Sequence, residues 1–160
     1  MEIHNYKLTI QYDGTRYLGW QKLGQRGSRD YQRTIQGKLE TLLSKMTGEE
    51  IEVQGAGRTD GGVHALGQTA SFRTAFETTP EEILAYCARY LPEDIAVTAA
   101  EEVPERFHAR LHARGKTYRY VLRLSDTPDV FRSRYEYRIS GPLDLAAMET
   151  AARALAGTHD

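Results

Sequence analysis

The order in which two hydrophobic periodicities alternate along the chain constrains its fold more than any other feature. Apolar residues occupy alternate positions in the segments 7–12, 51–54, 68–72 and 95–98, a pattern typical of half-buried strands. Apolar residues at helical spacing separate the first strand from the second, and the third from the fourth. This order predicts a ferredoxin-like split βαβ unit (βαββαβ) in the α+β class.

Both predicted helices carry signals for their ends. The first is expected to begin near Ile35 and to end at Gly48. The second begins with a capping box formed by Thr79 and Glu82, with Pro80 in its first turn. Its apolar stripe is expected to contain Ile83, Leu84, Cys87, Tyr90 and Leu91.

The C-terminal part of the chain is expected to enlarge this unit. The segments 116–124 and 134–139 are predicted to form a hairpin that extends the antiparallel sheet, followed by a helix with an apolar stripe over 145–155. Because 160 residues is the length of one ordinary domain, we expect a single catalytic-type domain spanning 1–160.

The distribution of charge points to a local, basic surface. The formal net charge of −1 gives no overall attraction to nucleic acids. The segment 106–134, however, carries eight Lys or Arg against Asp126 and Asp129, which leaves +6 there and −7 elsewhere. Either an RNA-binding face or an ordinary solvated strand face is compatible with this pattern.

Cysteine content and hydropathy bear on the cellular compartment. Cys87 is the single cysteine, so neither an internal disulfide framework nor a cysteine-based zinc site can form within one chain. No segment approaches the roughly 18 apolar residues that a membrane span requires. We therefore expect a cytoplasmic protein that makes no membrane contact.

The segment GAGRTDGGVH, residues 55–64, is the strongest candidate for a functional site. Five of the thirteen residues from Gly55 to Gly67 are glycine, which indicates positive φ angles or close backbone approach around Arg58 and Asp60. A dinucleotide fingerprint would need glycine in place of Asp60, and a P-loop would need lysine in place of Val63. We therefore expect no nucleotide cofactor.

With a nucleotide cofactor excluded, Asp60 could be a metal ligand, a reactive carboxylate or a structural turn residue. A metal site with Asp60 and His64 lacks a recognisable zinc signature, and Arg58 would compete with the cation, so we expect no metal and a hydrogen-bonding role for His64. A carboxylate on a rigid turn can act as a nucleophile or proton acceptor. The alternative is that Asp60 caps a turn and pairs with Arg58.

Six ordered segments resemble the tRNA pseudouridine synthase A family. The most specific is GAGRTDGGVHALGQ at 55–68; the others are YDGTRYLGWQ, TIQGKLE, LPEDIAV, FHAR and KTYRY. The resemblance implies a cofactor-free isomerase that converts uridine to pseudouridine in the tRNA anticodon stem-loop, at tRNA positions 38–40. It also implies a homodimer with tRNA lying across both subunits.

The resemblance implies roles for individual residues. Asp60 corresponds to the nucleophile, Tyr118 to the aromatic residue that stacks on the target base, and Arg58 to a residue that assists base flipping and helps hold the aspartate. Phosphate contacts are expected from a group of basic residues: Arg16, Lys22, Arg26, Arg29, Arg106, Arg110, Arg114 and Lys116. Strand alternation by itself assigns Tyr118 to core packing. Trp20, in the loop after the first strand, is expected to be a partly buried loop anchor rather than a stacking platform.

Length is the main departure from the family pattern. Family members continue into a second domain that completes the cleft, so we expect the present chain to be weakly active or inactive alone. The loop 23–32 is also longer than the family usually shows. Two other functions compete: a non-catalytic RNA-binding module on a ferredoxin-like sheet, and a metal-dependent hydrolase. The sequence leaves open whether Asp60 attacks C1′, attacks C6 or acts through an elimination.

Overall fold

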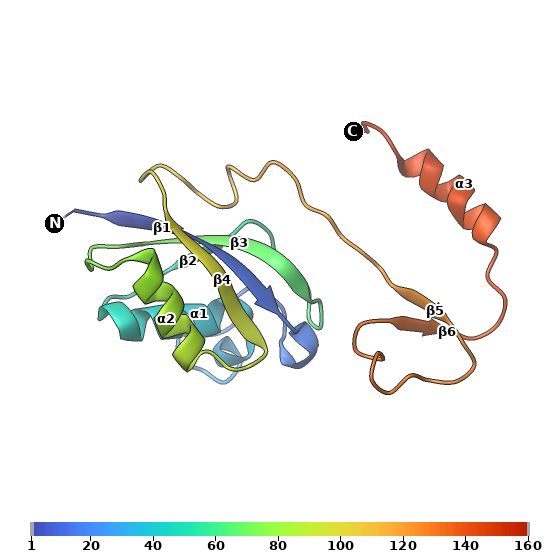
Figure 1. Cartoon of the computed structure of the whole chain (residues 1–160), viewed down its shortest axis with the longest axis horizontal. Coiled ribbons are helices and arrows are strands. Elements are labelled where there is room, and N and C mark those ends of the chain that lie inside the picture. The colour runs from blue at the N-terminus through green and yellow to red at the C-terminus, as the bar shows by residue number, and fades with distance from the viewer. Residues whose placement is uncertain (1, 160) are drawn as a thin grey trace. The chain divides into compact units, whose positions relative to one another are not determined.

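A computed structural model describes residues 2–159 (Figure 1). The chain divides after Lys116 into two compact units, and each is described by itself. The expectation of a single domain spanning 1–160 stays a prediction.

The first unit is a four-stranded antiparallel sheet with two helices packed on one face (Figure 1). The sheet order is β2-β3-β1-β4. In chain order the elements are β1 (His4–Tyr12), α1 (Ile35–Thr47), β2 (Val53–Gly55), β3 (Ala65–Thr74), α2 (Pro80–Tyr90) and β4 (Ile95–Glu102), with short 3-10 turns at Gly14–Arg16 and Tyr31–Arg33.

The strand pairing confirms the ferredoxin-like prediction. Strand β3 pairs antiparallel with both β1 and β2, so β1 and β2 run in the same direction with β3 between them. Helix α1 connects these two parallel strands, which is the split βαβ arrangement. On its other side β1 pairs antiparallel with β4, with Tyr6 opposite Glu102 and Tyr12 opposite Ile95.

Alternation along β1 determines which face of the sheet becomes the core. Tyr6, Leu8 and Ile10 are fully buried on the face that the helices cover. The helices contribute the complementary apolar stripes predicted from their periodicity. The fully buried helical members are Ile35, Leu39, Leu43, Ile83 and Cys87. Burial raises the pKa of the Cys87 thiol to about 12, so it stays protonated and unreactive.

The ends of both helices follow the sequence signals, but one residue of the apolar stripe predicted for α2 is exposed. Gly48 closes α1 in the left-handed conformation, with φ 73°. The Thr79–Glu82 capping box forms at the start of α2. Tyr90, which was expected in the apolar stripe of α2, is instead 52% exposed and contacts the ring of Tyr86. Tyr90 is the last residue of α2, and its ring packs against Tyr86 and the Arg89 guanidinium instead of joining the core cluster.

The second unit corrects the predicted C-terminal hairpin. Strands β5 (Leu122–Leu124) and β6 (Tyr137–Ile139) pair in parallel and form a separate two-stranded sheet that does not extend the first. The connection 125–136 is about a dozen residues long, which is the length that lets a chain cross over and return in the same direction. Residues 117–121, predicted as strand, form none.

Helix α3 (Leu145–Leu155) is present as predicted, capped by Asp144, but no residue in it is buried. Tyr118 is 64% exposed and precedes β5, so the core-packing alternative for this residue is wrong.

The core of the first unit generates a stability prediction. Leu8→Ala is expected to lower the free energy of unfolding by about 2–5 kcal/mol, because it removes a fully buried side chain and leaves a cavity. Leu66→Ala is the control, since Leu66 lies on β3 but is 83% exposed, and it should change stability by less than about 0.5 kcal/mol. Urea unfolding measures both; equal losses would contradict the assignment of the core face.

Candidate active site

The segment that carries Asp60 is held by direct backbone contact with the loop after β1. The Trp20 N–H donates to the Thr59 carbonyl over 2.9 Å, and Gly19 and Asp60 form an isolated antiparallel bridge. The Gly62 N–H donates to the Tyr17 carbonyl over 3.3 Å. Asp60 is therefore fixed by main-chain hydrogen bonds on a surface loop.

Glycines on both sides permit this close approach. A Cβ added at Gly19 would lie 2.6 Å from the Thr59 carbonyl oxygen, and a Cβ at Gly14 would overlap the carbonyl oxygen of Val63. Gly55 makes room for the Trp20 indole, which a Cβ would approach to 2.5 Å. The sequence indicated the cluster at 55–67 but gave no sign that Gly14 and Gly19 were its partners.

Side chains reinforce the contact between the two loops. The hydroxyls of Tyr12 and Thr59 are hydrogen-bonded at 2.8 Å. The Gly14 N–H donates to Nδ1 of His64 over 3.1 Å, which confirms the predicted hydrogen-bonding role of His64. Trp20 is only 2% exposed, which confirms its role as a buried loop anchor.

The Asp60 side chain itself is exposed and uncommitted. Within residues 2–159 its carboxylate makes no hydrogen bond or ion pair, and the exposed Arg58 guanidinium makes none either. The alternative in which Asp60 pairs with Arg58 is therefore wrong. A rigid backbone combined with an unpaired carboxylate suits a group that reacts with a bound molecule.

A pocket of about 410 Å³ opens beside Arg58, within the first unit. Its walls come from the loop after Trp20, from β2 and from the segment after β4. Four cationic side chains line it: Lys22, Arg58, Arg110 and Lys116. Its other polar side chains are Gln21, Gln36, Glu52 and Gln54. The structure thus brings together four residues that the sequence proposed for RNA contact.

The segment with Arg110 and Lys116 is anchored on the sheet by buried polar contacts. The Asn5 side-chain amide donates to the carbonyls of Pro104 and Phe107 over 3.1 and 2.8 Å. The Ala109 N–H donates to the Ser71 hydroxyl over 3.1 Å. Because Asn5 and Ser71 lie on alternate positions from the core residues, this segment crosses the face of the sheet opposite the helices.

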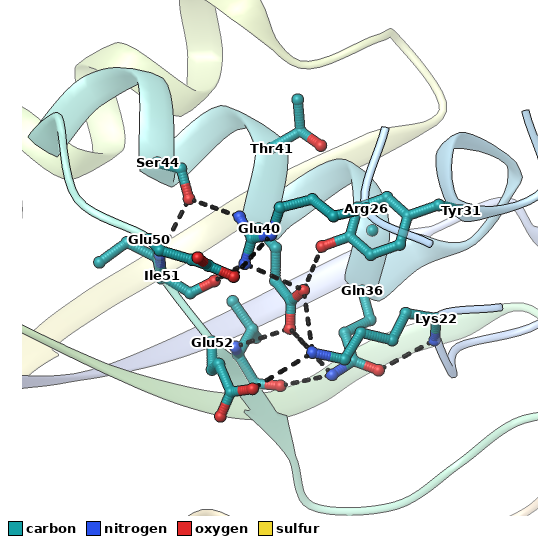
Figure 2. A network of polar contacts seen from close by, with 12 residues as sticks. Lys22, Arg26, Tyr31, Gln36, Glu40, Thr41, Ser44, Glu50, Ile51 and Glu52 are labelled. Carbon is teal, nitrogen blue, oxygen red and sulfur yellow. Dashed lines mark hydrogen bonds and ion pairs between the residues drawn. The ribbon is translucent and has the colours of Figure 1, made fainter. Parts of the chain in front are cut away.

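A buried carboxylate, Glu40, organises the loop that supplies Lys22 to the pocket (Figure 2). Glu40 on α1 is fully buried and accepts hydrogen bonds from the Tyr31 hydroxyl, from Gln36 at 3.0 Å and from the Val53 N–H at 3.1 Å. Lys22 Nζ lies 3.2 Å from Glu40 Oε1, and Arg26 Nη2 lies 3.8 Å from Oε2. Glu40 thus ties the loop after Trp20 to both α1 and β2.

The Glu40 cluster also fixes the charge state of its tyrosine partner. Burial, and then the hydrogen bond to Glu40, raise the pKa of Tyr31 above its ordinary value, so the hydroxyl remains a donor at neutral pH. Lys22 and Arg26 are partly compensated by Glu40, Glu50 and Glu52. The sequence predicted RNA contacts for Lys22 and Arg26 but gave no sign of their ion pairs with Glu40.

The remaining predicted basic residues have different surroundings. Arg16 donates two hydrogen bonds to Asp94 Oδ2, at 2.9 and 2.6 Å, and Tyr17 donates to Asp94 Oδ1 at 2.7 Å. Arg29, Arg106 and Arg114 are exposed and form no ion pair within the described chain. Tyr118 belongs to the second unit.

Two negative findings apply to residues 2–159 only. No group of three or more His, Cys, Asp or Glu side chains is placed to hold a metal ion. None of the helices combines the length and apolar character needed to cross a bilayer.

Comparison with known proteins agrees with these local features. The family model described as tRNA pseudouridine synthase matches residues 8–111, which include both loops and the walls of the pocket except Lys116. The chain belongs to the tRNA pseudouridine synthase family. The family match thus covers Asp60 and the split βαβ unit from the middle of β1 onward.

Several bacterial proteins are similar to this chain over almost its whole length. The chain is 44% identical to a tRNA pseudouridine synthase A 2 of Bacillus cereus, over 99% of this chain and 62% of the relative. It is 47% identical to a tRNA pseudouridine synthase A of a Bacillus species, over 99% of this chain and 63% of the relative. A Clostridium tetani relative is 46% identical over 99% and 62%, respectively. The chain therefore spans just under two thirds of the length of these relatives.

The buried carboxylate generates a paired stability prediction. Glu40→Gln keeps the shape but leaves Lys22 and Arg26 without a buried counter-charge; because both cations are about one third exposed, the expected loss is about 2 kcal/mol. Glu52→Gln removes an exposed carboxylate from the same lysine and should cost less than about 1 kcal/mol. Equal unfolding free energies for the two variants would contradict a structural role for Glu40.

The contact between the loops generates a second prediction. Gly14→Ala is expected to cost about 1–3 kcal/mol, because its Cβ would overlap the Val63 carbonyl and push the Asp60 loop away. Gly67→Ala is the control, since its Cβ would meet only Thr9 Cγ2 at 3.9 Å. Thermal unfolding and hydrogen exchange at residues 59–63 measure the effect; unchanged protection of these amides in Gly14→Ala would refute it.

Proposed function

We propose that this chain takes part in converting uridine to pseudouridine in tRNA, with Asp60 as the nucleophile. The observation that supports it best is the exposed carboxylate of Asp60, which has no partner among residues 2–159 and lies on a loop fixed by main-chain hydrogen bonds. Four cations line a pocket beside the neighbouring Arg58. Family membership supports the reaction class, and the relatives' names state it for those proteins.

The reaction balances without any cofactor. The N1–C1′ glycosidic bond breaks, the uracil turns, and a C5–C1′ bond forms; C5 then loses its proton to solvent, and N1, which carried none in uridine, takes one up. Asp60 would assist by attacking C1′ or C6, or by an elimination that the same carboxylate promotes. In each case the carboxylate must be ionised and reachable, and the exposed position of Asp60 meets the second condition.

Two further residues have proposed roles in presenting the base. A uridine in a stem must leave the base stack at a cost of roughly a few kcal/mol before a carboxylate can reach it. Arg58, two residues from Asp60 and free of ion pairs in the described chain, would occupy the vacated position. Tyr118, with its exposed ring, would stack on the extruded base.

The finer assignments follow from the resemblance to the family. We propose the anticodon stem-loop as the target, a homodimer as the form of the full-length enzyme, and the cytoplasm as its location. Because the chain spans under two thirds of its relatives, we also propose that it turns over slowly by itself. The basic residues at 106–116 provide the phosphate contacts that any of these targets would need.

Substitution of Asp60 tests the proposal. Asp60→Asn is expected to reduce product by about 10⁴-fold or more while leaving tRNA binding within about twofold, because it removes the nucleophile but little of the surface. Release of tritium from tRNA labelled at uridine C5 measures product, with the chain in excess over tRNA so that slow turnover is counted. Asp30→Asn, an exposed carboxylate without a side-chain capping bond, is the matched control.

Three outcomes would contradict this proposal in different ways. Product from Asp60→Asn at the parent rate would remove Asp60 from the nucleophile role. Loss of product in Asp30→Asn as well would indicate a general charge effect. Binding of tRNA by the parent chain without any product would favour the non-catalytic RNA-binding module.

A further inference from the structure

The pocket beside Arg58 is distinct from the position of the Asp60 carboxylate. Asp60 does not line it, whereas Arg58, two residues earlier, does. All of its lining residues belong to the first unit, so its shape does not depend on the placement of the second. Its volume of about 410 Å³ is within the range of small-ligand sites.

The chemistry of the walls disfavours a flat base as the occupant. Trp20 is the one aromatic residue among the lining residues, and it is 2% exposed with its indole packed against Gly55. The other side chains that face the pocket are mainly amides and cations. A pyrimidine or purine ring would lack a stacking partner there, while an anion would find several donors.

The cations around the pocket are mostly uncompensated. Lys22 is held by Glu40 at 3.2 Å and by the exposed Glu52 at 3.5 Å. Arg58, Arg110 and Lys116 form no ion pair in the part of the chain described. Three unpaired positive charges around one hollow repel each other, and a bound anion would relieve this repulsion.

The position of Lys116 depends on Gly57, which belongs to the segment GAGRTDGGVH that also contains Arg58 and Asp60. A Cβ added at Gly57 would lie 2.9 Å from Lys116 Nζ and 3.1 Å from its Cε. Gly57 therefore leaves the space in which the Lys116 ammonium lies against the backbone just before Arg58. Lys22, which also lines the pocket, is held by the buried Glu40 (Figure 2).

We infer that this pocket binds a backbone phosphate of the RNA, next to the nucleotide that is presented to Asp60. The inference rests on the proposed function for its choice of RNA as the source of the phosphate. Guanidinium groups match phosphate oxygens in a two-point fork, and lysine adds a point charge. Such a contact carries no sequence information but fixes the register of the strand relative to Asp60.

The test compares pocket variants with a charge-matched control. Arg110→Gln, Lys116→Gln and the double variant remove cations from the pocket. Lys45→Gln/Arg89→Gln removes the same charge from exposed positions on α1 and α2 that form no ion pair in the described chain. Fluorescence anisotropy with a labelled anticodon stem-loop RNA gives the Kd of each variant over a range of salt concentrations, and urea unfolding checks that each is folded.

A shared phosphate predicts a specific pattern of binding losses. Each single variant is expected to weaken RNA binding about 3- to 10-fold. The double variant should lose less than the product of the two, and its slope of log K against log salt should fall by about 0.7–0.9, the value for one phosphate contact. The control should change binding less than about twofold. Equal losses of RNA affinity in the control and the double variant would contradict a phosphate site in the pocket. So would losses that multiply in the double variant together with a salt-slope change equal to two phosphate contacts.

Two further measurements separate this inference from the proposed function and from a site for free anions. If the parent chain forms no pseudouridine but the pocket variants show the predicted pattern, the pocket stands and the proposed activity fails. If tritium release is normal in the double variant and its binding matches the control, the pocket fails and the activity stands. Competition by inorganic phosphate that disappears in the double variant while RNA binding does not change would indicate a free-anion site and overturn the RNA assignment.

Discussion

The backbone contact between the loop after β1 and the loop after β2 is the constraint on which the candidate site depends. Main-chain hydrogen bonds join Trp20 to Thr59 and Gly62 to Tyr17, and glycines at 14 and 19 allow the approach. Main-chain contacts of this kind leave the nearby side chains unused. Asp60 and Arg58 can therefore be both precisely placed and free for a ligand, a combination that side-chain anchoring would not provide.

Glu40 performs the complementary task for the loop that follows Trp20. That loop contains no regular strand or long helix, and its cations would repel each other on an isolated surface. A fully buried carboxylate gives Lys22 and Arg26 a common partner and also accepts the Val53 N–H at the edge of β2. The basic residues around the pocket therefore fall into two groups. Lys22 and Arg26 pair with Glu40 and stabilise the loop, whereas Arg110 and Lys116 form no ion pair within residues 2–159.

The split βαβ unit was predictable because its signals are local. Alternation in β1, the capping box at Thr79 and the glycine at 48 each depend on a few neighbouring residues, and each appears as expected. The C-terminal segments were not predictable in the same way. Apolar alternation over 116–124 suggested a long strand, but only Leu122–Leu124 pairs, and it pairs in parallel with Tyr137–Ile139. Strand direction is decided by the path of the connection, which periodicity does not encode.

The sequence alone determined the fold class of the first unit and drew attention to Asp60, Arg58 and the glycines around them. It did so because periodicity, capping and glycine content act over short distances along the chain. Tertiary structure decided the rest: that Gly14 and Gly19 face the Asp60 loop, that Glu40 holds Lys22 and Arg26, and that Lys22, Arg58 and Lys116 line one pocket. These are contacts between residues far apart in the chain, and their energies depend on distance and burial in space, which no local pattern records.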